Sequence, residues 1–458
     1  MEPTIEQWIE EHQKQMLEDI AALVRIPSVA SVKETKVSGE PFGKACRNVL
    51  DKMKKIADRE GICGRDAEGY YLSLEAGEGE TQIGVWSHLD VVPEGDGWIY
   101  PPFVCTRKGD YLIGRGIQDN KGPAIAVFYA ICYCKEHNLL KSIRIRHLLG
   151  CQEESGMQDV AHFLEKKEEP AFSFVTDCGF PVCCGEKGIL RISFKSAEKM
   201  EEFSRLQAGV VCNSVPSSAE AEIQTGNGCT HLTADGIGGH AAFPEGTVNA
   251  VSVLLQRLEE YSLRKETEKA LAFLRLLAAD GYGKAAGIAC SDEVSGSLTC
   301  NLGILCMEEG YIRAEVDIRY PVSVKSEDFL PVLLKKAEMS GMKLIYKEDS
   351  KPYYMEKEHP FIQVLMRTWK EETGQDGEPY VMGGGTYAKK LPHTVAFGPG
   401  MPKNFQEIEL PEGHGNCHGA DEAETITNLK KAVKIYIKAF INLDKWVKER
   451  KENENVSD

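Results

Sequence analysis

The chain has 458 residues, of which 42% are hydrophobic and 27% are charged. This balance is typical of globular proteins, and at about 150 residues per domain the length favours two or three domains. A count of 54 basic against 70 acidic residues gives a net charge of −16. We therefore expect no nucleic-acid partner, because such a partner requires a basic face.

Cysteine usage and apolar patterning both indicate a cytoplasmic protein. The 15 cysteines include no Cys-x-x-Cys pair, and in a chain of this length they are typical of reduced thiols. The first residues, MEPTIEQWIEEHQ, are too polar for a signal peptide. The longest apolar stretch, 124–134, has about half the length of a membrane span, so we expect no membrane partner.

The first part of the chain alternates helices with strands. Apolar spacing predicts helices over 6–25, 43–57, 124–134 and 157–166, and strands over 72–74, 83–87, 143–149 and 172–176. A loop rich in glycine and proline occupies 93–115. This alternation predicts an α/β layer with a largely parallel sheet.

The pattern changes after residue 188 and returns near residue 352. Between them, alternating strands are predicted over 190–194, 221–223, 298–306 and 311–320, and helices over 248–261, 267–277 and 327–339. Beyond them, helices over 360–373 and 425–448 flank a strand over 394–397. We therefore predict a discontinuous main domain, 1–187 with 351–458, and an inserted α+β domain, 188–350.

Metal-type donor side chains stand where predicted strands end or a helix begins. They are His88 with Asp90, Asp119, Glu153 with Glu154, and Asp177. Each has a simpler interpretation: Asp119 could cap a helix, and most Glu-Glu pairs lie on the surface. Sites in open α/β sheets form at the carboxyl ends of the strands, so the coincidence of four such junctions predicts one shared crevice.

Several motifs then appear in a recognisable order. They are SHLDVVPEGDGW, GRGIQDNKGPAIA, EESGMQD, TDCGFPVCCGEKG, GIGGHAAFPEGTVNA, EVDIRYP, MGGGTYA, AFGPG and HGADE. Together they resemble the clan MH dizinc metallopeptidases, a group that contains dipeptidase PepV, carnosinase, carboxypeptidase G and the aminoacylases, and most of all the PepV-type dipeptidases. The resemblance implies a phosphorylase/hydrolase-like zinc-peptidase domain with a mixed, largely parallel sheet and an inserted ferredoxin-like lid.

The resemblance also implies a set of metal-site residues. One zinc would bind His88 and Asp177, the other Glu154 and His418; Asp119, followed by a cis peptide bond, would bridge both, Asp90 would orient His88, and Glu153 would be the general base. Mn²⁺ or Co²⁺ could replace Zn²⁺. His414 is a rival ligand, although the His-x-x-Asp-Glu spacing favours His418. Asn120 departs from the usual Asp at a position that is not a ligand.

A second set of residues would bind the substrate. In the insert, the resemblance assigns His240 to the oxyanion, Arg319 to the substrate carboxylate and Asn213 to the carbonyl or carboxylate. The alternative for Arg319 is a salt bridge at a strand end. In the main domain, Gly384, Gly385 and Thr386 would form a turn of backbone donors.

The implied activity is hydrolysis of dipeptides with a free N-terminus by a metal-bridging water, with Glu153 as the base. Asp177, where aminoacylases and carboxypeptidase G have Glu, favours a dipeptidase. The alternative is an N-acyl amino acid deacylase or desuccinylase with the same metals. A metal-binding scaffold without catalysis is a third reading, disfavoured by the complete ligand set. The chain could be a monomer or a homodimer.

Overall fold

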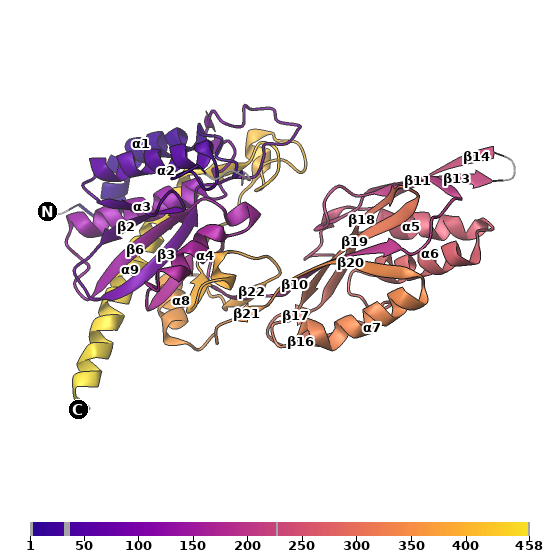
Figure 1. The fold of residues 1–458 in the computed structure, drawn as a ribbon. Helices are drawn as coiled ribbons and strands as arrows, with labels where there is room; N and C mark the ends of the chain where they lie inside the picture. The colour runs from indigo at the N-terminus through magenta and orange to yellow at the C-terminus, as the bar shows by residue number, and fades with distance from the viewer. Residues whose placement is uncertain (1–2, 32–36, 226–227, 457–458) are drawn as a thin grey trace. The chain divides into compact units, whose positions relative to one another are not determined.

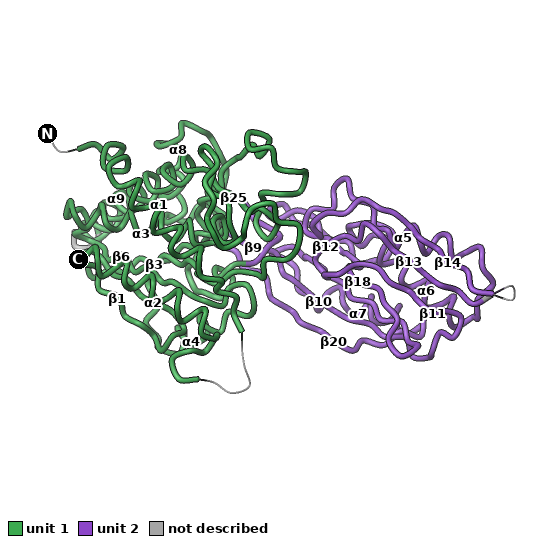
Figure 2. The backbone as a smooth tube through the Cα atoms, turned by 90° about the horizontal axis from the view of Figure 1, so that it is seen from above, with its two compact units in different colours: residues 1–184, 355–379, 386–458 green, residues 185–354, 380–385 purple. Residues whose placement is uncertain are grey.

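The computed structural model describes residues 3–31, 37–225 and 228–456. Contacts divide the chain into two units (Figure 2). Unit 1 comprises 1–184, 355–379 and 386–458, and unit 2 comprises 185–354 and 380–385. The predicted insert, 188–350, differs from unit 2 by a few residues at each end, and it did not include 380–385, which the main domain was expected to hold.

Six α-helices belong to unit 1 within the described ranges (Figure 1). They are α1 (Ile5–Val24), α2 (Lys44–Arg59), α3 (Lys121–Glu136), α4 (Gln158–Glu165), α8 (Pro360–Thr373) and α9 (Ile426–Val456). Helix α1 begins at a capping box, in which Thr4 and Gln7 satisfy each other's backbone N–H groups. Helix α8 ends at Gly374, which has a φ of 68°, as a helix C-terminus favours.

The main sheet crosses unit 1. Its strands, in spatial order, are β1 (Gly64–Asp66), β2 (Tyr71–Ala76), β6 (Ile143–Gly150), β3 (Thr81–His88), β7 (Phe172–Val175), β23 (Thr394–Ala396) and β9 (Cys183–Glu186). Strand β3 runs parallel to both β6 and β7, and β7 runs parallel to β23. Strand β2 is antiparallel to β6. The α/β class with a mixed, centrally parallel sheet is therefore confirmed.

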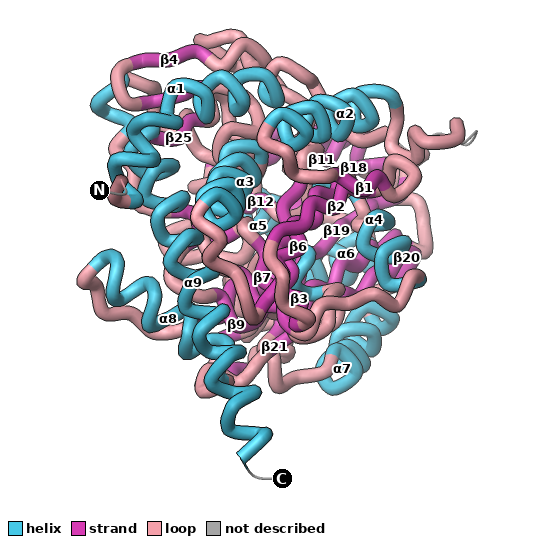
Figure 3. Tube along the Cα trace, turned by 90° about the vertical axis from the view of Figure 1, so that its left-hand side faces the viewer, coloured by secondary structure: helices cyan, strands magenta, loops and turns pink. Residues whose placement is uncertain are grey.

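Helices cover both faces of this sheet. Val85 of β3 and Phe174 of β7 are register partners, so their side chains share one face. On that face Phe174 stacks on Tyr436 of α9, and α3 lies along α9 (Figure 3). On the opposite face Trp86 packs against Phe163 of α4, with ring centroids 4.9 Å apart. The candidate site lies at the carboxyl ends of β3, β6 and β7, not on either face of the sheet.

Short strands complete unit 1. Strands β4 (Thr106–Lys108), β5 (Tyr111–Ile113) and β25 (Ala423–Thr425) form a small sheet, and β8 (Cys178–Gly179) pairs with β24 (Pro399–Gly400). The predicted loop 93–115 thus contains two strands. They are hard to predict because β5 is stabilised by pairing with β25, some 300 residues away.

Unit 2 is built on a seven-stranded antiparallel sheet. Its order is β14 (Gly228–Asp235), β13 (Ser218–Thr225), β11 (Phe203–Ala208), β18 (Thr299–Glu308), β19 (Tyr311–Tyr320), β10 (Gly188–Ser196) and β20 (Met342–Ser350). Helices α5 (Ala250–Arg257), α6 (Lys265–Ala278) and α7 (Ser326–Met339) share one apolar core with the sheet, including Leu254, Leu274 and Leu333. The expected α+β architecture of the insert is present.

The remaining strands of unit 2 are short. They are β12 (Ser214–Val215), β15 (Gly239–His240), β16 (Ser291–Asp292), β17 (Gly296–Ser297), β21 (Tyr353–Tyr354) and β22 (Tyr380–Met382). Strand β21 pairs with residues 185–186 of β9, and β22 also pairs with β9. Among the helices described in either unit, none combines the length and apolar character needed to cross a bilayer.

Candidate metal and catalytic site

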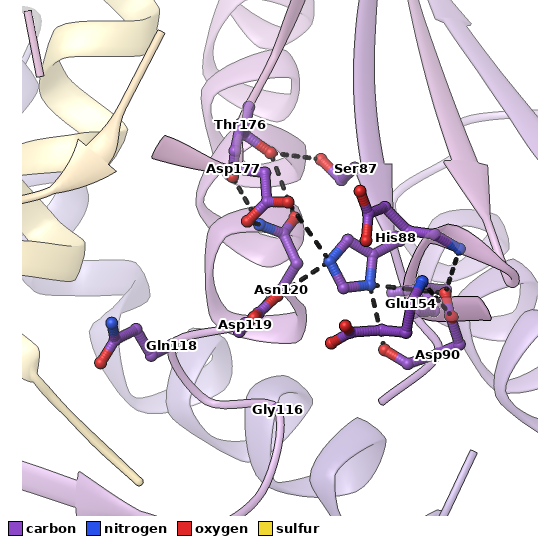
Figure 4. Close-up of polar contacts among 12 residues, drawn as sticks. Ser87, His88, Asp90, Gly116, Gln118, Asp119, Asn120, Glu154, Thr176 and Asp177 are labelled. Carbon is purple, nitrogen blue, oxygen red and sulfur yellow. Dashed lines mark hydrogen bonds and ion pairs between the residues drawn. The ribbon is translucent and has the colours of Figure 1, made fainter. Parts of the chain in front are cut away.

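Four segments meet at the carboxyl ends of the central parallel strands, as predicted. His88 is the last residue of β3, and Glu153 opens a 3₁₀ turn just after β6. Asp177 follows β7, and Asp119 lies just before α3. Because β3, β6 and β7 are mutually parallel, these ends share one edge of the sheet. Figure 4 shows the Asp119 and Asp177 side chains pointing toward the His88 ring.

Asp119 lies between two imidazoles. Its Oδ1 is 2.9 Å from Nε2 of His88, and its Oδ2 is 3.1 Å from Nε2 of His418. The same Nε2 of His418 is 3.1 Å from Oε1 of Glu154. The Asp119–Asn120 peptide bond is cis, as the resemblance implied. One carboxylate thus faces two potential metal positions, each with its own histidine.

His414, the rival ligand, is held elsewhere. Its Nδ1 is 2.6 Å from Oδ2 of Asp421. The Asp421 carboxylate also accepts the backbone N–H groups of Ile99 and Tyr100. The geometry therefore favours His418 as the donor at this edge of the site.

The donor atoms form two overlapping groups compatible with metal ions. One contains His88, Glu153 and Asp177, and the other contains His88, Asp119 and Glu154, with the donor atoms of each group all within 4.8 Å of one another. Glu153, expected to be the base, thus lies where a ligand could also lie.

Three buried donor atoms in the site support a fit to metal. Nε2 of His88 and Oδ1 of Asp119 are buried and 2.9 Å apart but are not aligned as a hydrogen bond, and the buried Oε1 of Glu153 has no hydrogen-bond partner among the described residues. Leaving buried polar atoms unsatisfied costs free energy. Imidazole and carboxylate donors are the ligands that zinc takes in catalytic sites, so the residues present fit a divalent metal.

The charges of the site also favour binding of a metal cation. Burial, followed by the negative charge of Asp119, raises the pKa of Asp177 to about 7. Burial and the charge of Asp177 raise the pKa of Glu153 well above its usual value. Hydrogen bonds to Asp119 and Glu154 raise the pKa of His418 to about 11. The site contains four carboxylates and only two imidazoles, so its negative charges outnumber its possible positive charges. Added positive charge would reduce the repulsion among the carboxylates.

Asp90 connects His88 to the turn that carries the glutamates. Nδ1 of His88 is 3.0 Å from the backbone carbonyl of Asp90 and 3.4 Å from its carboxylate. The two carboxylate oxygens accept the N–H groups of Glu153 and Glu154. Asp90 therefore orients the imidazole mainly through its main chain, while its fully buried side chain fixes the Glu153–Glu154 backbone.

Arg115 and Glu422 were not predicted as site residues, yet both hold the loops that carry the candidate metal ligands. They form a buried ion pair with Nη1 and Oε2 2.8 Å apart. Glu422 accepts the backbone N–H groups of Gly116, Gln118 and Asp119. Arg115 donates to the carbonyls of His418 and Gly419. The signal was present in the sequence, since both are charged residues inside the GRG and HGADE motifs.

The residues expected to bind substrate fall mostly in unit 2. Asn213, His240, Arg319, Gly384 and Gly385 belong to unit 2, and Thr386 belongs to unit 1. The Asn213 carbonyl accepts the N–H of Ala241. The Thr386 hydroxyl accepts the N–H of Ala388 and caps the 3₁₀ turn Tyr387–Lys389. The sequence argument had placed the glycine turn wholly in the main domain.

Arg319 is engaged by its neighbours. Its Nε and Nη2 pair with the two oxygens of Asp317 at 2.5 and 2.9 Å, and its Nη1 donates to the Gly383 carbonyl. This is the strand-end salt bridge named as the alternative. A carboxylate role for Arg319 therefore stays a prediction, and it would require Asp317 to give up part of this pairing.

Comparison with known proteins supplies the remaining observations. A sequence profile of the peptidase family M20/M25/M40 matches residues 84–442. The Bacillus subtilis (strain 168) protein named “Putative dipeptidase YtjP” is 31% identical over 463 residues, which cover 94% of this chain and 97% of that protein.

Solved structures share the fold at low sequence identity. Human carnosine dipeptidase 1 has a TM-score of 0.61 at 14% identity, covering 96% of this chain and 98% of its own. The Bacillus subtilis YXEP protein, titled a dinuclear metal-binding peptidase from the M20 family, has a TM-score of 0.53 at 11% identity, covering 95% and 99% of the two chains. The similarity of fold extends over both units.

Proposed function

Because this chain belongs to the peptidase family M20/M25/M40, we propose that it is a dizinc dipeptidase acting on substrates with a free N-terminus. The family supplies metal-dependent peptide hydrolysis, while the metal, the substrate and the residue roles are the proposal. The observation that carries it is the position of Asp119, whose two oxygens face His88 and His418 at 2.9 and 3.1 Å.

The proposed ligand sets follow from that position. One zinc would be held by His88, Asp119 and Asp177, and the other by Asp119, Glu154 and His418. When bound, such ions lower the pKa of water and polarise a carbonyl. Mn²⁺ or Co²⁺ could serve with the same ligands. The buried Arg115–Glu422 pair would keep the loops of Asp119 and His418 in register.

Glu153 is the proposed general base. It would take a proton from the attacking water and pass it to the leaving amine. Burial and the charge of Asp177 raise its pKa, and a base works best with a pKa near the working pH. The Asp90 carboxylate accepts the Glu153 N–H and thereby limits the positions that the base can take.

The substrate ends would be recognised by different groups. The free ammonium would be bound by Asp177, whose carboxylate can accept a hydrogen bond beside its metal. His240 and Asn213 of unit 2 would act on the reacting carbonyl. An N-acyl group removes the ammonium charge, so blocked substrates should be poorer. We also propose that the enzyme is cytoplasmic, because its 15 cysteines are typical of reduced thiols.

The test compares kcat/KM for Ala-Ala, N-acetyl-Ala-Ala and Ala-Ala-Ala with zinc-loaded enzyme. We expect Ala-Ala to be the best substrate of the three. Glu153→Gln, assayed in parallel, controls for contaminating peptidases. Faster turnover of the N-acetyl compound would replace the dipeptidase with a deacylase while leaving the metal assignments standing.

A further inference from the structure

Unit 2 contains a pocket of about 420 Å³ whose lining residues all belong to that unit. The residues that matter for its chemistry are Lys187, Phe243, Tyr282, Lys284 and Thr299. Its volume lies in the range of small-molecule sites.

The side chains of this pocket carry an excess of positive charge. Lys187 is only 8% exposed, and its Nζ donates to the Ser297 carbonyl at 2.6 Å. Lys284 stands 5.8 Å from the centre of the Tyr282 ring. The one lining carboxylate, Glu245, already accepts the Tyr282 hydroxyl at 2.7 Å. The lining therefore holds two lysines and one engaged carboxylate, and Asp292, outside the lining, also acts on Lys187 through its charge.

Thr299 adds an unsatisfied polar group to the same pocket. Its side chain is 3% exposed, and within the described residues its hydroxyl has no hydrogen-bond partner. Buried hydroxyls are normally bonded. A ligand with acceptor atoms would satisfy this group.

The pocket adjoins the residues of unit 2 that are proposed to act on the substrate. Thr299 is the register partner of Arg319 in the β18–β19 pair. Gly383, also in the lining, accepts a hydrogen bond from Arg319. Ala242, a further lining residue, donates its N–H to Nδ1 of His240 at 3.1 Å.

We propose that this pocket binds the side-chain carboxylate of an acidic residue in the peptide substrate. Lys187, Lys284 and the Thr299 hydroxyl would donate to the carboxylate, since charge-assisted donors are the strong ones. The rings of Tyr282 and Phe243 would contact its methylene groups. The inference rests on the proposed function and deepens it, because it adds a preference for Asp- or Glu-containing dipeptides.

The kinetic test uses the zinc-loaded full chain with two pairs of dipeptides, Ala-Glu against Ala-Gln and Glu-Ala against Gln-Ala. In at least one pair the acidic member should have the higher kcat/KM. Thr299→Val and Lys187→Met should each reduce that ratio, with a loss of about tenfold or more for a donor to a charged group. Lys335→Met, at an exposed lysine of the same unit, is the matched control and should keep the ratio.

Thr299→Val is also the pocket variant that is expected to fold as well as the wild type. It removes a hydroxyl that has no partner within the described residues, so the melting temperature should stay the same or rise. Ratios near one in the wild type, or an unchanged ratio in a well-folded Thr299→Val enzyme, would overturn the proposal.

A binding measurement separates this inference from the proposed function. Glutarate is titrated calorimetrically into the zinc-loaded wild type and both pocket variants, with glutaramide as the neutral comparison. If no dipeptide is turned over, the proposed function fails, and glutarate then decides the pocket alone. Binding that both variants weaken supports a carboxylate site, and binding that neither variant changes overturns it.

Discussion

Asp119 is the residue on which the geometry of the site converges. Its two carboxylate oxygens face His88 and His418, and its backbone N–H donates to the buried carboxylate of Glu422. Glu153, by contrast, has a buried oxygen without a hydrogen-bond partner among the described residues. The two acids should therefore respond differently to substitution.

Glu153→Gln should abolish most turnover while both metal ions stay bound. Loss of a general base costs about 10²–10⁴ in rate, and the five proposed ligands are untouched. Asp119→Ala should lose metal, because both positions share its carboxylate. Metal analysis of the two purified variants after gel filtration separates base from ligand. Loss of metal from Glu153→Gln with retention in Asp119→Ala would reverse the assignment.

Glu422→Gln should weaken metal binding, although Glu422 is not a proposed ligand. The neutral amide would lose the charge that pairs with Arg115 and would accept the three loop N–H groups less strongly. Substitutions behind the ligands typically cost about 10–100-fold in metal affinity. Competition with a chromophoric chelator measures the affinity. The exposed Glu412 provides the control, Glu412→Gln, and equal affinities in the two variants would contradict the role.

His240→Ala should lower kcat far more than it changes metal content. The proposed partner of His240 is the oxyanion, which develops only in the transition state, and loss of such a donor costs about 10²–10³ in rate. Single-turnover kinetics tests the expected fall in rate, and metal analysis of the same preparation tests the expected retention of metal. An unchanged kcat in a folded variant would remove His240 from the mechanism.

At the level of elements, strand β6 contains a buried histidine with a pH consequence. His147 is fully buried, its Nε2 lies 3.0 Å from Oγ of Ser87, and burial lowers its pKa to about 3. The imidazole stays neutral in the fold, whereas the unfolded chain takes up a proton near pH 6.5. The stability it contributes is complete above pH 6.5 and is lost as the pH falls toward 3.

The expected result is a pH-dependent difference between wild type and His147→Asn. Between pH 7 and pH 5 the free energy of unfolding of the wild type should fall by about 2 kcal/mol more than that of the variant. Urea unfolding of metal-free protein at both pH values measures this, and groups common to both proteins cancel in the difference. Parallel pH dependences would show that His147 does not titrate as argued.

Much of the architecture could be predicted from local pattern. Strands β3, β6 and β7 alternate with helices and end at or shortly before donor residues, and this pattern indicated both the parallel sheet and the edge that carries the site. Pairings between distant segments were not predictable. The Arg115–Glu422 pair joins residues 307 positions apart, and Arg319 pairs with Asp317 because alternate residues of a strand share one face. Residues 380–385 join unit 2, where β22 pairs with β9, a contact without a local sequence signal.

At the level of the whole molecule, metal removal should affect the two units unequally. All proposed ligands belong to unit 1, and a ligand that binds only the folded form stabilises it by about 4 kcal/mol at a thousand times its Kd. A strong chelator should lower the melting temperature of unit 1 and leave that of unit 2 unchanged, and added zinc should restore the melting temperature of unit 1. Calorimetry with and without the chelator measures both transitions. Activity should vanish and return in step. Full activity after chelation would refute the metal requirement.

The positions of the two units in the sequence decide the order in which the ribosome completes them. Residues 185–354 of unit 2 are continuous, so this segment can fold while the ribosome is still adding residues, as domains commonly do during synthesis. Unit 1 must wait, because β23, His418 and α9 all come after that segment. A nascent chain released before residue 418 would contain His88, Asp119, Glu154 and Asp177 but lack the histidine of the second metal position. The proposed metal centre can thus be completed only after residue 418 has been added, so a shorter nascent chain lacks a complete site for cleaving peptides.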